Sequence, residues 1–147
     1  MVCIIIPMSG IGKRFIDAGY SDPKPLIMVD NKYIIEHVIN LYDRNKDKFI
    51  FICNDKHLKE TKMREILLSI CPTCEIHEVP TEGREGPVHA VSLMFDKIPD
   101  NEKVIVSYCD YGTYWDYQEF LKDNEIRTCD GAIACYKGFH PHMLGTD

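Results

Sequence analysis

The chain has 147 residues, 45% of them hydrophobic and 27% charged, which suits one compact domain with a sizeable core. Its formal net charge of −6 argues against a nucleic-acid partner, because duplex binding calls for a basic face. No apolar run approaches the roughly 20 residues of a membrane span, and the N-terminus lacks the charged start of a secretory signal. We therefore expect a cytoplasmic protein without a membrane partner.

Apolar runs and amphipathic stretches alternate along the chain. A continuous apolar run predicts a buried strand at 2–6, and apolar residues three and four apart predict a helix at 33–44. The alternation continues with strands at 48–53, 75–79, 103–107 and 131–136, and with helices at 57–70, 88–95 and 115–124. Buried strands joined by helices indicate an α/β fold with a mainly parallel sheet, whose ligands bind beyond the carboxyl ends of the strands.

A glycine-rich loop follows the first predicted strand. Gly10 and Gly12 let the backbone approach a phosphate chain closely, and Lys13 and Arg14 place two positive charges beside those amides. Farther along, two prolines bracket Lys24. Because proline fixes its own φ and extends its predecessor, this lysine is presented on a stiff segment. The alternative is a proline-rich turn with a solvated lysine.

Two familiar glycine motifs fit this loop poorly. A dinucleotide-binding fingerprint needs a third glycine where Phe15 stands, and the loop runs on to Asp30 without a clear helix. Asp30 does stand where a ribose-binding acid would fall, so this alternative stays open. A Walker loop is excluded, because Pro7 stands at its first glycine and Arg14 at its magnesium-binding serine or threonine.

The loop and the lysine segment together resemble a known family. G-x-G-x-R followed by P-K-P-L is similar to the nucleotidyltransferases that make activated sugars and other headgroups, in the variant that begins P-M-S-G. The resemblance extends through Gly86 and residues 108–115, so it covers nearly the whole chain. It implies a Rossmann-like, three-layer α/β/α fold of the nucleotide-diphospho-sugar transferase type.

The resemblance also implies roles for individual residues. Arg14 would steady the triphosphate and the departing pyrophosphate, and Lys24 would contact the α-phosphate and the acceptor, which makes both catalytic. Lys13 stands where threonine or serine is common in the family. The implied nucleotide-binding residues are Met8, Ser9, Gly10, Gly12, Lys13, Thr81, Gly86 and Val88.

The segment at 81–90 departs from the family pattern. Gly86-Pro-Val-His-Ala resembles the family's G-T-A-x-A turn, in which Gly86 would offer its N–H to the base. Thr81 stands where many members use glutamine to read uracil or thymine, so the choice of base stays open. The loop at 82–86 is either a base-reading loop or a solvated one, and we expect His89 to be a helix residue rather than a catalyst.

An acid follows the strand predicted at 103–107. Asp110 lies at its carboxyl end, where a carboxylate can hold Mg²⁺ together with substrate phosphates, with Mn²⁺ as the alternative ion. The competing interpretation is an Asx turn or a helix cap. Cys109 is expected to be a packing residue.

The resemblance implies an enzyme that couples a nucleoside triphosphate (CTP, UTP or dTTP) to a small phosphorylated acceptor and releases pyrophosphate. The P-M-S-G and C-D-Y-G variants are similar to members encoded with capsule or surface-polysaccharide genes, such as the cytidylyltransferase that charges phosphoglutamine. The alternatives are a non-catalytic nucleotide-binding module and a GT-A-type glycosyltransferase, although the D-x-D pattern of the latter is absent at Asp110.

The resemblance sets expectations for domain organisation. We expect a nucleotide-binding catalytic core at 1–136 and the start of an acceptor-binding region at 137–147, apparently truncated, because family members are longer. A second metal-binding acid would then lie beyond residue 147. The pair His140 and His142 is a weak metal candidate, and the oligomeric state stays open, with a homodimer as one option.

The seven cysteines favour a reduced protein over a disulfide framework, because most lie in apolar runs. Cys71 and Cys74 form a C-x-x-C pattern without the second pair that a zinc site needs. We interpret this segment as a turn before a strand, with a metal or redox site as the alternative.

Overall fold

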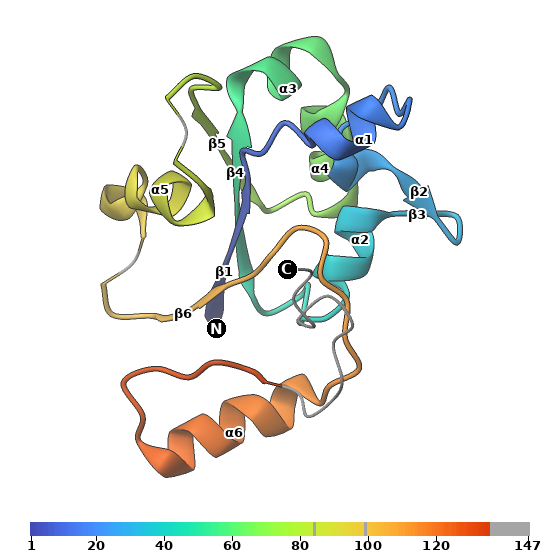
Figure 1. Cartoon of the computed structure of the whole chain (residues 1–147). Helices are drawn as coiled ribbons and strands as arrows, with labels where there is room; N and C mark the ends of the chain where they lie inside the picture. The colour runs from blue at the N-terminus through green and yellow to red at the C-terminus, as the bar shows by residue number, and fades with distance from the viewer. Residues whose placement is uncertain (84, 99, 136–147) are drawn as a thin grey trace, which may run out of the picture. The chain divides into compact units, whose positions relative to one another are not determined.

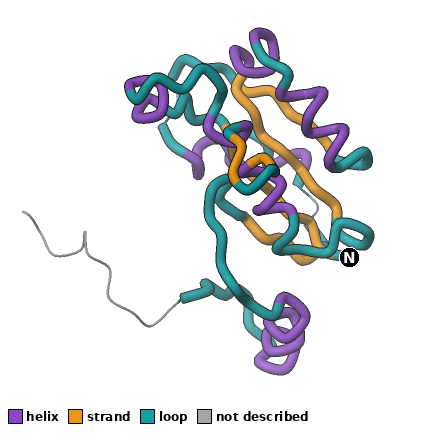
Figure 2. The backbone as a smooth tube through the Cα atoms, turned by 90° about the vertical axis from the view of Figure 1, so that its right-hand side faces the viewer, coloured by secondary structure: helices purple, strands orange, loops and turns teal. Residues whose placement is uncertain are grey.

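The computed structural model describes residues 1–83, 85–98 and 100–135. Its core is a four-stranded sheet with the strand order β5-β4-β1-β6, in which every neighbouring pair is parallel (Figures 1 and 2). The strands are β1 (Val2–Met8), β4 (Lys48–Asn54), β5 (Glu75–Val79) and β6 (Lys103–Val106). All seven residues of β1 are buried, because it lies between two strands and under helices on both faces. The prediction of a mainly parallel sheet is confirmed.

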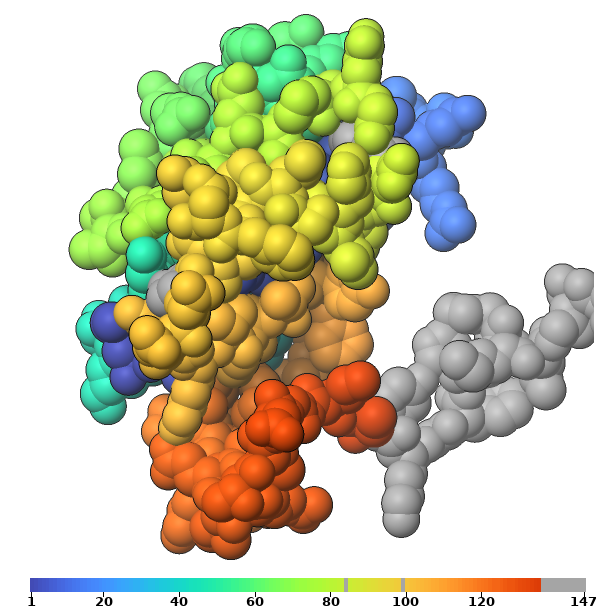
Figure 3. Space-filling model, turned by 90° about the vertical axis from the view of Figure 1, so that its left-hand side faces the viewer, coloured from blue at the N-terminus to red at the C-terminus, as the bar shows by residue number. Residues whose placement is uncertain are grey.

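Helices cover both faces of the sheet, which gives three layers (Figure 1). On one face, Ile5 and Ile50 lie side by side and pack with Ala90 of α5 (Pro87–Ser92). Figure 3 is viewed from this side, and the atoms of α5 and of the loop before it form much of the visible surface. The opposite face carries Phe49 and Phe51, whose stacked rings are 6.3 Å apart. The helices α2 (Ile34–Ile39) and α4 (Met63–Ile70) lie on that side.

The strand order creates a switch point beside β1. The chain first builds the sheet in one direction, from β1 to β4 to β5, and then returns past β1 to add β6 on the other side. In open α/β sheets the ligand crevice lies outside the carboxyl ends of the two strands at such a point, here β1 and β6. Residues 9–13 follow β1 at this crevice, and residues 107–110 follow β6.

The segment expected to lack helices contains two short ones, so that expectation is wrong. They are α1 (Lys13–Asp17) and the single 3-10 turn η1 (Lys24–Leu26). A hairpin follows, made of β2 (Met28–Val29) and β3 (Lys32–Tyr33). Asp30 and its neighbour form the turn of this hairpin with φ of 48° and 61°, a conformation that asparagine and aspartate tolerate. Asp30 thus serves a turn, which removes the support for a dinucleotide fingerprint.

The single helix predicted at 57–70 is two helices, α3 (Asp55–Glu60) and α4. Thr61 interrupts them with an extended backbone, at φ −131° and ψ 172°. Its hydroxyl donates to the carbonyl of His57 at 2.6 Å and accepts from the N–H of Met63 at 3.2 Å. One side chain therefore satisfies a backbone carbonyl at the end of α3 and a backbone N–H at the start of α4. Such side-chain hydrogen bonds compete with those of a continuous helix, and an apolar pattern does not reveal them.

The chain divides into two compact units, Met1–Trp115 and the residues from Asp116 onward. The second unit contains α6 (Tyr117–Arg127), whose N-cap Asp116 accepts from the N–H of Glu119 at 2.8 Å. The strand predicted at 131–136 is not formed at 131–135, where every residue is exposed and unpaired with any described strand. Residue 136 and the segment 137–147 lie outside the described residues. Within the part described, no helix is long and apolar enough to cross a bilayer.

Candidate functional site

Lys24 and Asp110 meet at the crevice between β1 and β6. They lie 86 residues apart in the sequence, and the ammonium of Lys24 forms an ion pair with Oδ2 of Asp110. The two side chains retain 31% and 30% of their exposure, so a ligand from solvent can reach both. The sequence analysis selected both residues, and the fold brings them together.

The two prolines hold Lys24 in place. Pro23 has φ −55° and ψ 141° and is buried, and Pro25 is buried in the first turn of η1. The ammonium of Lys24 also lies 5.1 Å from the centroid of the Phe15 ring, within the range of a cation–π contact. The stiff presentation expected from the sequence is therefore observed, and an aromatic ring of α1 reinforces it.

Contacts on both sides fix the segment that carries Asp110. The N–H of Ser107 donates to the carbonyl of Ile5 at 2.9 Å, which continues the pairing with β1 beyond the end of β6. Farther along, Trp115 donates from Nε1 to the carbonyl of Leu41 at 3.2 Å. These anchors, before and after Asp110, keep its carboxylate at the switch point. Burial raises the pKa of the neighbouring thiol, Cys109, to about 11, so this cysteine is a neutral packing group at neutral pH.

The glycine loop lies against the lysine segment. Met8 and Ser9 are buried at the end of β1, and Gly12 then adopts φ 67° as the N-cap of α1. A Cβ added to Gly12 would lie 3.7 Å from the Cβ of Lys24, which shows how closely the two segments approach. The side chains of Lys13 and Arg14 are exposed on α1, and neither forms an ion pair with a described residue. Two unpaired cations therefore stand beside the backbone amides of the loop.

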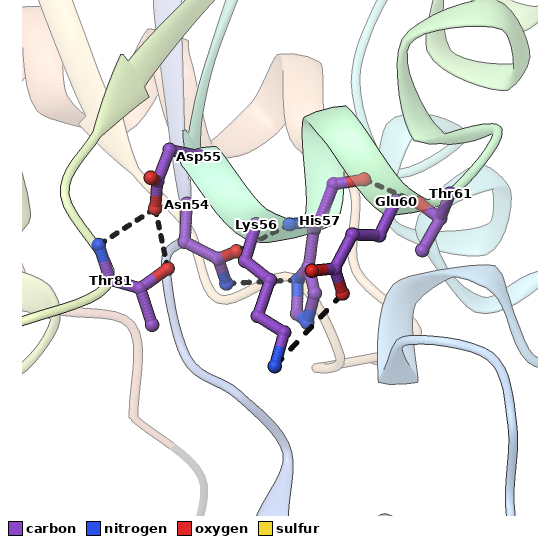
Figure 4. Close-up of polar contacts among 7 residues, drawn as sticks. All are labelled: Asn54, Asp55, Lys56, His57, Glu60, Thr61 and Thr81. Atoms are coloured by element: carbon purple, nitrogen blue, oxygen red, sulfur yellow. Dashed lines mark hydrogen bonds and ion pairs between the residues drawn. The ribbon is translucent and has the colours of Figure 1, made fainter.

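Asn54 connects the glycine loop to the next strand. It ends β4, is fully buried and donates from Nδ2 to the carbonyl of Ser9 at 3.1 Å. Its Oδ1 accepts from the N–H of His57 at 2.7 Å and so caps α3 (Figure 4). The sequence analysis missed this residue as part of the site. The available signal was an asparagine directly after a buried strand, because asparagine is a preferred N-cap residue.

Thr81 is engaged by Asp55 (Figure 4). One carboxylate oxygen of Asp55 accepts from both the N–H and the hydroxyl of Thr81, at 2.9 and 2.6 Å. The other oxygen faces the ammonium of Lys59 at 3.2 Å. The Thr81 hydroxyl first, and then Lys59, lower the pKa of Asp55 to about 2, so Asp55 is ionised at neutral pH. The hydroxyl hydrogen of Thr81 is directed to Asp55.

The rest of the expected base-reading segment leads into α5 and forms its first turn. Gly86 has φ 109° and ψ −176°, a conformation that favours glycine, and it is the N-cap of α5. Val88 is 81% exposed in the first turn. His89 lies in α5, as expected, and its Nδ1 accepts from the N–H of Glu85 at 3.3 Å. This loop follows β5, two strands from β1, or roughly 10 Å at the usual strand spacing.

Asp110 fits a divalent ion only in combination with a substrate. No group of three histidine, cysteine, aspartate or glutamate side chains that could hold a metal occurs among the described residues. Mg²⁺ commonly uses one or two carboxylates together with substrate phosphates. One partly exposed carboxylate beside exposed cations therefore fits an ion that arrives with a polyphosphate, rather than an ion held by the protein alone.

The fold is similar to solved structures of nucleotide-sugar enzymes. A nucleoside-diphosphate-sugar pyrophosphorylase from Vibrio cholerae RC9 is 23% identical, with a TM-score of 0.62, over 80% of this chain and 52% of that one. A putative glucose-1-phosphate thymidylyltransferase from Bacillus anthracis, in complex with sucrose, is 18% identical, with a TM-score of 0.66, over 86% and 51%. A UDP-glucose pyrophosphorylase complexed with UDP-glucose is 17% identical, with a TM-score of 0.60, over 88% and 55%. The chain thus spans about half the length of these proteins, and identities this low show the shared fold.

A comparison with curated proteins finds no significant match. The sequence profile of a family described as the MobA-like NTP transferase domain matches residues 4–146, which is nearly the whole chain. The resemblance to sugar-phosphate nucleotidyltransferases and the three-layer fold that it implied are both confirmed. The chain belongs to the MobA-like NTP transferase domain family.

Proposed function

We propose that the chain carries the nucleotide-binding part of a nucleotidyltransferase, which joins a nucleoside triphosphate to a small phosphorylated acceptor. The observation that carries the proposal is the meeting of Lys24 and Asp110 beside the glycine loop, at the switch point of the sheet. Ligands of open α/β sheets bind at such a point. Two exposed cations on α1 suit a polyanion in the same crevice.

The reaction needs positioning and charge stabilisation more than covalent help. An oxygen of the acceptor phosphate attacks the α-phosphorus, a new P–O bond forms, and the bond to the β-phosphate breaks, with its electron pair leaving on pyrophosphate. In this proposal the backbone amides of the glycine loop, together with Lys13 and Arg14, bind the triphosphate. Lys24 holds the α-phosphate and the acceptor in line.

Asp110 is the residue that would hold Mg²⁺, or Mn²⁺ in its place. The ion would supply positive charge to the phosphate oxygens and orient them. In the protein alone, Lys24 neutralises the carboxylate of Asp110. A triphosphate competes for the lysine, and the released carboxylate then becomes available to a cation. The ion pair therefore holds both groups in place before the substrate arrives.

For the donor we propose a pyrimidine nucleotide, namely CTP, UTP or dTTP. The loop after β5 carries Thr81 and the N–H of Gly86 at the base-reading positions that the family resemblance implies. For the product we propose a precursor of capsule or surface polysaccharide, made in the cytoplasm. The P-M-S-G and C-D-Y-G sequences support this choice.

Calorimetry with each nucleoside triphosphate and Mg²⁺ tests binding by the 147-residue chain. Pyrophosphate release, measured with sugar 1-phosphates and phosphoamino acids, then tests transfer. We expect this chain to bind one pyrimidine triphosphate, and the whole protein, with its acceptor-binding region, to release pyrophosphate in an acceptor-dependent way. Binding without release would favour a nucleotide-binding module, and a nucleoside diphosphate released from a sugar nucleotide would favour a glycosyltransferase. A chain that binds none of the triphosphates would overturn the proposal.

Substitutions identify the residues responsible. In the whole protein, Lys24→Ala and Asp110→Ala should each lower turnover by about a hundredfold or more, the usual effect of losing one charge-stabilising group. Lys97→Ala is the matched control, because this lysine pairs with its neighbour Asp96 on the surface. Near-normal turnover of the first two variants at saturating Mg²⁺ would contradict their assigned roles.

A further inference from the structure

A pair of cysteines lies away from the proposed nucleotide site. Cys71 is the C-cap of α4, and Cys74 directly precedes β5. The pair is therefore at the amino end of β5, whereas Thr81 follows its carboxyl end. Cys71 is only 3% exposed and Cys74 is half-buried, and both are free thiols.

A backbone turn brings the two cysteines close together. The N–H of Cys74 donates to the carbonyl of Cys71 at 3.1 Å, which closes a four-residue turn. Such a turn keeps its end Cα atoms within about 7 Å, and a disulfide needs roughly 4.4–6.8 Å. Bond formation therefore requires little movement of the chain.

The surroundings favour reaction at Cys71. The neighbouring thiol of Cys74 lowers the pKa of the Cys71 thiol against the opposing effect of burial, and the positive charge of Arg44 acts in the same direction as Cys74. Arg44 is held close by, because its Nη1 donates to the carbonyl of Ile70 at 3.3 Å. By contrast, burial raises the pKa of Cys53 to about 12. A thiolate is the reactive form of cysteine, so Cys71 differs from Cys53 in the direction of its pKa shift, although both are buried.

We propose that Cys71 and Cys74 are a redox-active dithiol that a small peroxide oxidises to an intrachain disulfide. The thiolate of Cys71 attacks one peroxide oxygen, the O–O bond breaks, and hydroxide leaves, which gives a sulfenic acid. The sulfur of Cys74 then attacks the sulfur of Cys71 and displaces the hydroxyl group as water. Two thiols and one hydrogen peroxide thus become one disulfide and two waters. The small exposure of Cys71 selects a peroxide over a bulky disulfide oxidant.

Tryptic peptides of the chain provide an internal control. Cleavage after lysine and arginine places Cys71 and Cys74 in peptide 65–84, with no other cysteine, and Cys129 and Cys135 in peptide 128–137. The control cysteines are exposed. The folded chain is treated with increasing concentrations of hydrogen peroxide, and its free thiols are alkylated. After digestion with trypsin, the masses of both peptides are measured by mass spectrometry.

We expect peptide 65–84 to lose the mass of two hydrogen atoms and to take up no alkyl group, at peroxide concentrations that leave peptide 128–137 fully alkylated. Dithiothreitol should restore both thiols. In Cys74→Ser, a dimedone adduct should appear on Cys71 instead, and Cys71→Ser should react more slowly. Two results would overturn the proposal: full alkylation of peptide 65–84 after peptide 128–137 has oxidised, or equally fast disulfide formation in urea-unfolded chain.

Discussion

Replacing Asn54 by alanine should destabilise the domain strongly for a single polar residue. The side chain is fully buried and makes two separate contributions, the cap of α3 and the hydrogen bond to the carbonyl of Ser9. Loss of an N-cap costs about 1 kcal/mol. Removing the buried donor to the carbonyl of Ser9 costs a further 1–3 kcal/mol or so. The free energy of unfolding should therefore fall by about 2–4 kcal/mol in Asn54→Ala.

Urea unfolding measures this loss, because the transition midpoint shifts in proportion to stability. With a slope of about 2 kcal/mol per molar urea, the midpoint should fall by roughly 1–2 M. Asn54→Ser keeps a capping oxygen but is too short to bond Ser9, so it should recover only the capping part. Asn45→Ala is the matched control on an exposed turn and should change stability by less than about 0.5 kcal/mol.

Two outcomes would refute this reasoning. If Asn54→Ala and Asn45→Ala have the same midpoint, the buried hydrogen bonds contribute nothing measurable. If Asn54→Ser is as unstable as Asn54→Ala, the cap of α3 contributes nothing measurable to the free energy of unfolding. Because Asn54 holds the carbonyl of Ser9, Asn54→Ala should also weaken triphosphate binding, a result that calorimetry can check on the folded variant.

Two further predictions concern the two loops of the site. Because the pKa of Asp55 is lowered on folding, its ionised carboxylate stabilises the fold above about pH 4, and this stabilisation is lost as the pH falls toward 2. The difference in unfolding free energy between wild type and Asp55→Asn should therefore shrink over that range. A constant gap in urea unfolding from pH 5 to 2 would contradict it. Gly12→Ala should cost about 1–2 kcal/mol from its positive φ, whereas Gly10→Ala should be neutral in the same assay. Equal stabilities would show that the Gly12 conformation is not required.

Local sequence patterns predicted the strands of the sheet, and the family resemblance selected the pair at its switch point. Runs such as 2–6 in β1 and 49–53 in β4 are buried on both faces, so every position in them is apolar and the pattern is easy to recognise. Because parallel strands align their carboxyl ends, residues after β1 and after β6 were expected to meet. The structure places Lys24 and Asp110 together for this reason.

Other features depend on contacts that no local pattern encodes. The pairing of Asp55 with Thr81 requires β4 and β5 to align so that Asn54 lies beside Val79. The break at Thr61 depends on where one hydroxyl points. The segment at 131–135 is apolar enough for a strand but has no described strand as a partner. Composition alone does not distinguish an apolar segment that joins a sheet from one that does not.

The central claim is that one metal-bound triphosphate contacts the glycine loop, Lys24 and Asp110 together. A crystal structure of the chain with Mn²⁺ and a triphosphate that cannot be cleaved between its α- and β-phosphates tests it directly, because Mn²⁺ is located by its anomalous signal. The account predicts that manganese lies on the Asp110 carboxylate and that the α-phosphate lies on Lys24. A triphosphate bound elsewhere, with the ion pair of Lys24 and Asp110 intact, would contradict it.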